Sequence, residues 1–136
     1  DRQALGAYYT ARFHEAYFGT PDQTVEWQRA QSDLRTLFSE VRAAGIPVGL
    51  AIFPVLIDLD DDAYGFQDIV DVVAGLGAAE KVPTFSLLPA FRGRGGPDLW
   101  VSDSDQHPNA SGHAIAGAAL APFVGELLRP STPPGS

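Results

Sequence analysis

Two carboxylates and a histidine stand close together near the C-terminal end of the sequence. Asp103, Asp105 and His107 are each separated by one residue, and Pro108 and Asn109 follow directly. A carboxylate that accepts a hydrogen bond from one imidazole nitrogen orients the ring and leaves the other nitrogen free to take a proton. This is the chemistry of a general base that activates a hydroxyl nucleophile. We therefore take His107 as the candidate base, Asp105 as its orienting acid and Asp103 as the alternative acid.

The same spacing also has a purely structural interpretation. Asn109 is a good helix-capping residue, and apolar residues at helical spacing follow it. A surface histidine beside such a cap, with no catalytic part, fits the spacing about equally well. Pro108 would stiffen the backbone after His107. His113, inside the expected helix, is either structural or a support for His107.

The segment 105–113 resembles the last sequence block of SGNH (GDSL-type) serine hydrolases, where an Asp and a His precede Pro-Asn and a Gly-His pair. The residues that carry this resemblance are Asp105, His107, Pro108, Asn109, Gly112 and His113. Four upstream segments look like the second half of bacterial members of the family: residues 43–48, 53–54, 87–91 and 99–102. The terminal block is fairly specific, and the other segments only add support.

The resemblance implies a fold and a reaction. The fold is a three-layer α/β/α sandwich with a parallel sheet, of which this chain would hold the last two strands and their helices. The reaction is hydrolysis of a small-molecule or carbohydrate acyl ester, as in esterases and lipases, by a serine nucleophile without cofactor or metal. His107 would be its general base and Asp105 the residue that orients the base.

The sequence departs from the family pattern in one large respect. The Gly-Asp-Ser block that supplies the nucleophile is absent, and so are the family's oxyanion Gly and Asn, since Asn109 is the only asparagine in the chain. We expect the serine to come from outside this chain, from the N-terminal half of the same domain or from a partner chain. The lack of any methionine fits a piece of a longer protein. Asp105 also stands two residues before His107, where many family members have three.

Two other functions fit the same residues. An acyltransferase or deacetylase acting on cell-envelope carbohydrate would use the same histidine and acid. A binding module with this fold would have no catalytic serine at all. The sequence does not identify the compartment, although export or the cell envelope is favoured.

Composition excludes several other classes of protein. A net charge of -8 repels phosphate backbones, so nucleic acid is not an expected partner. The absence of cysteine excludes disulfides and thiolate metal sites. The longest apolar run, residues 46–57, is too short to cross a bilayer and contains two prolines. Asp58, Asp60 and Asp62 lack the Gly and Glu of a calcium loop, so we expect them to cap a helix.

Hydrophobic spacing and turn residues predict the elements that must position the site. We expect a helix over residues 1–18, a helix that is capped by Thr20 and ends at Gly45, a strand over 48–53 buried on both faces, a helix over 66–77, a strand over 82–87, a loop over 91–97, and a last helix after Asn109. Strands that alternate with helices predict a parallel α/β sheet. Residues 1–129 are then the C-terminal part of an SGNH-hydrolase-like domain, and residues 130–136 a disordered tail.

Two further expectations concern packing. Tyr9, Phe13 and Tyr17 are four residues apart and share one face of the first helix, which is either a packing face or a lid over an acyl pocket. Two strands alone do not form a stable sheet with both faces covered, so a neighbouring strand must come from elsewhere.

Overall fold

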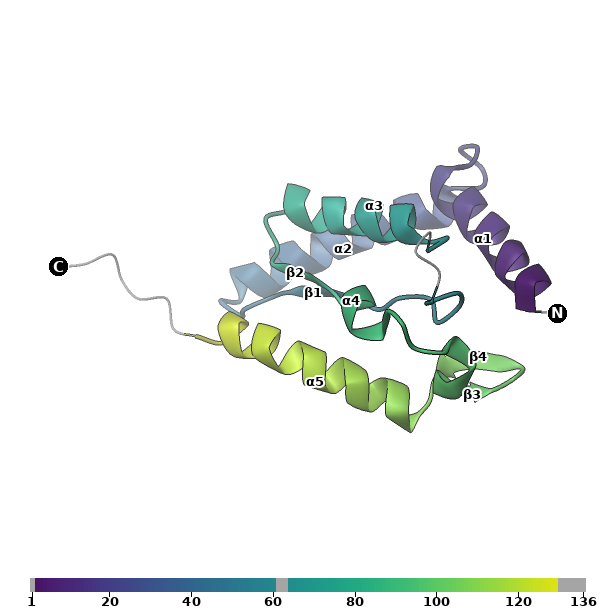
Figure 1. Ribbon diagram of the computed structural model, residues 1–136. Coiled ribbons are helices and arrows are strands. Elements are labelled where there is room, and N and C mark those ends of the chain that lie inside the picture. The colour runs from purple at the N-terminus through teal and green to yellow at the C-terminus, as the bar shows by residue number, and fades with distance from the viewer. Residues whose placement is uncertain (1, 61–63, 130–136) are drawn as a thin grey trace.

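The computed structural model describes residues 2–60 and 64–129 (Figure 1). The tail expected over residues 130–136 lies outside these ranges, as do Asp61 and Asp62 of the acidic run. The described elements are α1 (Arg2–Phe18), α2 (Val25–Ala43), β1 (Leu50–Ile52), α3 (Gln67–Ala79), β2 (Thr84–Ser86), α4 (Leu88–Phe91), the 3-10 helix η1 (Gly96–Leu99), β3 (Trp100–Ser102), β4 (Asp105–Pro108) and α5 (Ala110–Leu127).

β1 and β2 form a parallel pair whose register runs from Leu50 opposite Thr84 to Ile52 opposite Ser86. The two strands are joined through α3, which contacts both of them. Both lie within the ranges predicted from the sequence but are shorter. The chain is therefore a mixed α/β structure with one parallel strand pair.

Helices lie on both sides of this strand pair (Figure 1). On one side, Gly77 of α3 comes so close to Thr84 and Leu50 that a β-carbon at this position would collide with the threonine hydroxyl. On the other side, the Phe123 ring of α5 stacks on Phe85 with 5.3 Å between the ring centres. Because side chains alternate along a strand, Thr84 faces α3 and Phe85 faces α5.

The expectation that residues 48–53 are buried on both faces is wrong. Ala51 is exposed, and Phe53 is 38% exposed. The reason is that β2 is the only strand that pairs with β1 in the described part of the chain. The opposite edge of β1 borders a hollow of about 240 Å³ that Phe13 of α1 and Ile69 of α3 help to line.

The predicted start of the second helix is also wrong. Thr20 does not cap it: Gln23 N and Thr24 N both donate to Thr20 O, which closes a turn, and α2 begins at Val25. One bond typical of a helix capping box is nevertheless present, because Thr20 N donates to Gln23 Oε1 at 2.9 Å. The helix ends at Ala43, and Gly45 follows with φ of +71°. Glycine suits this left-handed conformation because it has no β-carbon.

The β3–β4 hairpin is absent from the sequence-based prediction, which places no helix or strand between residue 97 and Asn109. The hairpin is antiparallel and pairs Trp100 with Pro108 and Ser102 with Asp105, with an irregular register between them. Trp100 anchors it to the core, since the side chain is buried and its indole N–H donates to Leu56 O at 2.6 Å. β4 carries polar residues without apolar alternation, so it lacks the pattern by which strands are recognised.

The core lies between α3, the strand pair, α4 and the hairpin. Phe66, Phe91, Leu59 and Leu87 are its largest fully buried side chains. α1 packs on this core through Phe13, whose ring makes an edge contact with Phe66 at 5.6 Å. Tyr9 and Tyr17 are partly buried against the same cluster. The aromatic face of α1 is therefore a packing face, as the first of the two interpretations expects.

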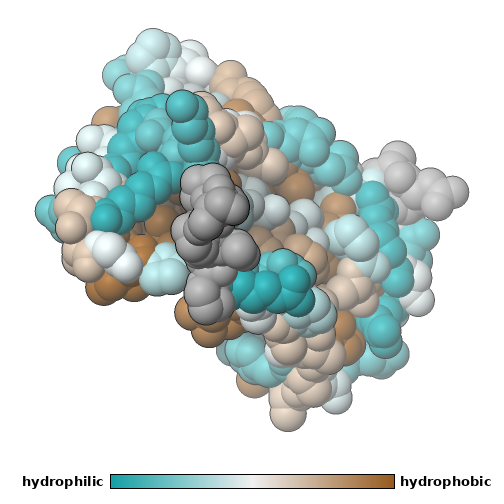
Figure 2. Space-filling model, turned by 90° about the vertical axis from the view of Figure 1, so that its left-hand side faces the viewer, coloured by the Kyte–Doolittle hydropathy of each residue, from teal (hydrophilic) through white to brown (hydrophobic). Residues whose placement is uncertain are grey.

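The surface keeps some apolar side chains in contact with solvent. Figure 2 shows hydrophobic surface at the end of the molecule where α2 passes into β1 and α5 ends. Ile46 and Leu128 are 56% and 65% exposed. Within the described ranges, no helix has the length and hydrophobicity needed to span a bilayer.

The buried position of Phe91 leads to a stability prediction. Phe91→Ala should lower the free energy of unfolding by about 3–5 kcal/mol, because it removes a fully buried ring and leaves a cavity. Phe18→Ala is the matched control, since Phe18 is 48% exposed, and should cost roughly 1 kcal/mol or less. Urea unfolding followed by circular dichroism measures both losses. Equal losses would contradict the assignment of the core.

Candidate active site

Asn109 fixes the backbone that carries the candidate base. Its side-chain oxygen accepts hydrogen bonds from Ser111 N and Gly112 N, as predicted for the cap of the last helix. Its side-chain amide donates to Trp100 O at 3.1 Å, and its backbone N–H donates to Leu99 O at 2.7 Å. One residue thus joins the start of the hairpin to the start of α5. His107 lies two residues before Asn109, so these hydrogen bonds also restrain the backbone of His107.

The Asp105 carboxylate contacts the His107 ring. Asp105 Oδ1 lies 2.6 Å from His107 Nδ1 and 3.0 Å from the His107 backbone N. Because a carboxylate only accepts hydrogen bonds, the shared proton is assigned to Nδ1, and Nε2 then carries the free lone pair. The contact that the sequence analysis expects between a carboxylate and His107 is therefore present, and Asp105 makes it.

Hydrogen bonding lowers the pKa of the Asp105 carboxyl below its ordinary value of 3.8. The largest cause is the bond from the His107 backbone N–H, followed by the bond from the ring and the charge of that ring. Both hydrogen bonds stabilise the ionised form. The side chains of His107 and Asp105 are 87% and 45% exposed, so the pair can be reached from outside the chain.

Asp103 does not take the part of the orienting acid in this structure. Its backbone oxygen accepts a hydrogen bond from the Gln106 amide at 3.0 Å, while its carboxylate makes no hydrogen bond to the His107 ring. In the described part of the chain, Asp105 is thus the acid that is bonded to the ring. The geometry therefore favours Asp105 over Asp103 as the acid that orients the ring.

The other predicted support residues differ in what they touch. Pro108 packs against Gly112, where a β-carbon would lie 2.9 Å from Pro108 Cβ, so the first turn of α5 needs a glycine at that position. His113 is exposed on α5, and its ring makes no hydrogen bond to His107 among the described residues. A support role for His113 therefore depends on the family resemblance alone.

Serines of the same hairpin lie near His107 but do not bond to it. The hydroxyls of Ser102 and Ser104 are 3.2 Å apart and hydrogen-bond to each other. Over residues 2–60 and 64–129, no serine hydroxyl is hydrogen-bonded to the His107 ring. The described chain thus brings the candidate base and its candidate acid together, and places no serine hydroxyl on the His107 ring.

A cleft of about 480 Å³ opens beside the pair. One wall is the hairpin from Ser104 to Pro108, the floor is residues 53–57, and the opposite wall is Tyr9 and Phe13 of α1. The sequence analysis named this aromatic face as a packing face or a lid over an acyl pocket, but did not place it beside His107. The four-residue spacing of the α1 aromatics showed a shared face, but nothing in the sequence indicated that the face lies opposite His107.

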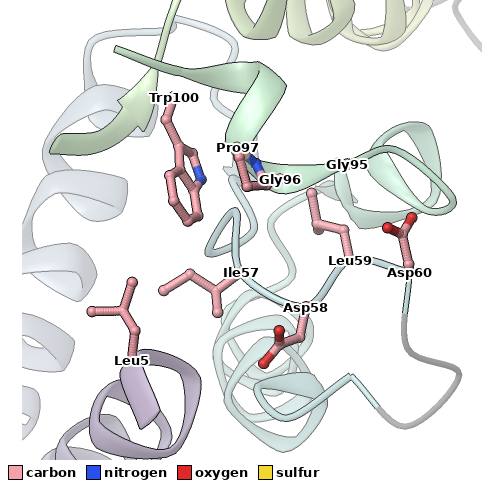
Figure 3. A pocket seen from close by; sticks show the side chains of 9 residues that line it. All are labelled: Leu5, Ile57, Asp58, Leu59, Asp60, Gly95, Gly96, Pro97 and Trp100. Atoms are coloured by element: carbon pink, nitrogen blue, oxygen red, sulfur yellow. The ribbon is translucent and has the colours of Figure 1, made fainter. Parts of the chain in front are cut away.

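A second hollow of about 340 Å³ has Leu5, Ile57 and Trp100 in its lining (Figure 3). It lies next to the cleft, since Ile57 lines both. Asp58 and Asp60 contribute carboxylates to it, and Asp58 adopts a positive φ of 53°. Where the structure describes the chain, no three His, Asp or Glu side chains are grouped so that they could hold a metal ion.

The expectation that Asp58 and Asp60 cap a helix is wrong, because α3 begins at Gln67 after Phe66 and no described side chain caps it. Asp62, the third member of that set, lies outside the described residues.

Comparisons with known proteins gave no match: no family model, no curated protein and no solved structure is significantly similar to this chain. The assignment to the SGNH hydrolases therefore depends on the residues of the terminal block and stays a proposal.

The Asp105–His107 contact predicts a titration that can be measured. The Asp105 carboxyl should titrate below 3.8 in the folded chain, and its pKa should rise only part of the way back in His107→Ala, because the backbone N–H of residue 107 remains. Carbon-detected NMR of the carboxyl group measures this. A depressed pKa adds stability above the unfolded value that is lost as pH falls through the folded value, so the small advantage of wild type over Asp105→Asn should shrink as the pH is lowered to and below 3.8. An Asp105 that titrates at or above 3.8 would refute the contact.

Proposed function

We propose that this chain supplies the general base of a serine hydrolase that cleaves acyl esters. The observation that carries the proposal is the contact of 2.6 Å between Asp105 Oδ1 and His107 Nδ1 at the side of a largely apolar cleft. The contact leaves Nε2 available as a base, and the cleft offers space for an acyl group beside it. The resemblance of residues 105–113 to the SGNH hydrolases adds independent support.

In the proposed mechanism, a serine from outside this chain attacks the ester carbonyl while its hydroxyl proton moves to His107 Nε2. Asp105 keeps the ring oriented and stabilises the imidazolium that forms. The imidazolium then gives the proton to the leaving alcohol, and an acyl-enzyme remains. A water molecule, deprotonated by the same nitrogen, attacks the acyl-enzyme and releases the acid and the serine. Every step uses side chains and water.

We infer that the complete domain is a three-layer sandwich whose remaining strands pair with β1. Leu50 N donates to Pro83 O, and Ile52 O accepts from Leu87 N, so these β1 residues direct their backbone groups toward β2. Alternation then directs the backbone groups of Ala51 to the opposite edge, where a further strand could pair. A parallel strand at this edge would end near residues 53–57, which form the floor of the cleft. The N-terminal half of the domain, or a partner chain, would thereby bring its loop to His107.

The test of function is made on the longer protein that includes this chain and the expected Gly-Asp-Ser block. A fluorophosphonate probe should label its serine. His107→Ala should lower the turnover of acyl esters by about 10⁴-fold or more, because the general base is lost. His113→Ala is the matched control, and should change turnover by less than about tenfold, since its exposed ring does not contact His107.

Two results would count against this function. Equal losses in the two variants would show that the wrong histidine has been chosen. A folded protein that neither reacts with the probe nor cleaves esters would instead be a binding module.

The position of the nucleophile gives a separate prediction for the 136-residue chain alone. It should show no esterase activity on short acyl esters, even at high protein concentration, and its open β1 edge should promote self-association. Size-exclusion chromatography and an esterase assay on the same sample decide this. A monodisperse, active monomer would place the nucleophile within this chain and refute the half-domain interpretation.

A further inference from the structure

One hydrogen bond connects the two walls of the cleft. The Tyr9 hydroxyl on α1 donates to Gln106 Oε1 on β4 at 3.3 Å, between residues 97 positions apart in the sequence. The other end of the same amide is also engaged, because Gln106 Nε2 donates to Asp103 O at 3.0 Å. The two contacts fix which way the amide faces, so that its oxygen is turned toward Tyr9. Figure 1 shows the N-terminal half of α1 on the side of the molecule that carries the hairpin.

Other contacts hold α1 in place independently of this bond. The Phe13 ring packs on Phe66, and His14 Nε2 lies 3.2 Å from both Gly65 O and Asp68 Oδ2. The Tyr9 hydroxyl is therefore not required to attach α1 to the core. Its contribution is local, at the point where α1 faces the residue that precedes His107.

The lining of the cleft indicates which chemical group it accepts. The floor between the two walls is apolar, with Phe53, Pro54, Val55 and Leu56 among its residues. The chain as a whole carries a net charge of -8, which disfavours anionic ligands. An uncharged alkyl or aromatic group matches both observations.

We propose that Tyr9 and Gln106 form a clasp that closes the cleft beside His107 and limits the length of the apolar group it admits. The identification of that group as the acyl chain of an ester rests on the proposed function. The clasp itself rests on the hydrogen bond between the walls and on the apolar floor beneath it. Tyr9 and Gln106 are thus specificity-determining residues, separate from the base and its acid.

The experiment measures binding of straight-chain primary alcohols, from 1-butanol to 1-octanol, to the isotope-labelled chain by NMR, at protein concentrations at which size-exclusion chromatography shows the chain to be monomeric. Shifts of the His107 and Tyr9 signals locate the ligand. In the wild type, affinity should rise about fourfold for each added methylene that is buried, and then level off when the chain reaches the clasp. In Tyr9→Phe the rise should continue to longer alcohols, by about fourfold for each further methylene, because only the hydroxyl that closes the cleft has been removed.

Two variants sharpen the result. Tyr8→Phe is the matched control: Tyr8 is 59% exposed, lies next to Tyr9, and loses the same hydroxyl without breaking the clasp. In Tyr8→Phe, affinity should depend on the length of the alcohol in the same way as in the wild type. Gln106→Leu removes the acceptor at similar size and should act like Tyr9→Phe, while the double variant should add nothing further.

Several outcomes would overturn the clasp. These are a wild-type affinity that never levels off up to 1-octanol, an unchanged profile in Tyr9→Phe, an equal change in Tyr8→Phe, and alcohol binding that leaves the His107 and Tyr9 signals unmoved. Alcohols bind without any serine, so the failure of the clasp and the failure of the proposed function are distinguishable. A longer protein that lacks esterase activity would refute the function alone.

Discussion

The side chain of Asn109 is the attachment on which the geometry around His107 depends. Its carbonyl oxygen caps α5, while its amide and the backbone N–H of the same residue bind carbonyls at the end of η1 and in β3. The cap of a helix and the closure of a hairpin are usually separate structures. Here one residue provides both, and Trp100 is the only residue of the two strands that is buried. Without this attachment, the hairpin would be joined to the fold chiefly through the buried Trp100.

A second constraint governs the fold as a whole. Apolar side chains on β1 and its flanks are more numerous than the described chain can cover, which leaves Ile46, Phe53 and the backbone of Ala51 near solvent. A backbone edge of this kind offers unpaired N–H and C=O groups to any strand that can reach it. The unpaired edge of β1 and the cleft lie close together in the described chain, because β1 leads directly into residues 53–57 of the cleft lining.

The features that could be predicted from the sequence are those that depend on residues close together in the chain. The last helix was predicted because Asn109 and an apolar stripe act within a few residues, and the parallel strand pair because apolar runs alternate with helices. The pairing of Asp105 with His107 was predictable for the same reason, since two residues of separation bring both within reach of one backbone turn. The choice between Asp105 and Asp103 stayed open, because it depends on how β4 is oriented.

What the sequence could not predict depends on contacts between distant residues. The hairpin has no alternating pattern, and its formation depends on the contact of Trp100 with Leu56, which are 44 residues apart. The exposure of Ala51 depends on which elements pack beside β1, and the apolar run itself carries no information about its neighbours. Similarly, the spacing of Tyr9 and Phe13 defines a helical face, but only the packed structure shows that the same face borders His107. The start of α2 is a smaller case. Thr20 accepts backbone hydrogen bonds that close a turn instead of capping the helix, so α2 begins only at Val25.

The inner face of α1 serves two purposes at once, and this limits how the protein can change. Phe13 contributes to the core through Phe66 and also to the wall of the cleft. A substitution that reshapes the cleft at this position also alters the packing that holds the helix, so selectivity and thermodynamic stability cannot be adjusted independently there. Tyr9 is different, because its hydroxyl can be removed while its ring stays in contact with the core. Changes that adapt the cleft to new ligands, by selection or by protein engineering, should therefore occur more readily at Tyr9 than at Phe13.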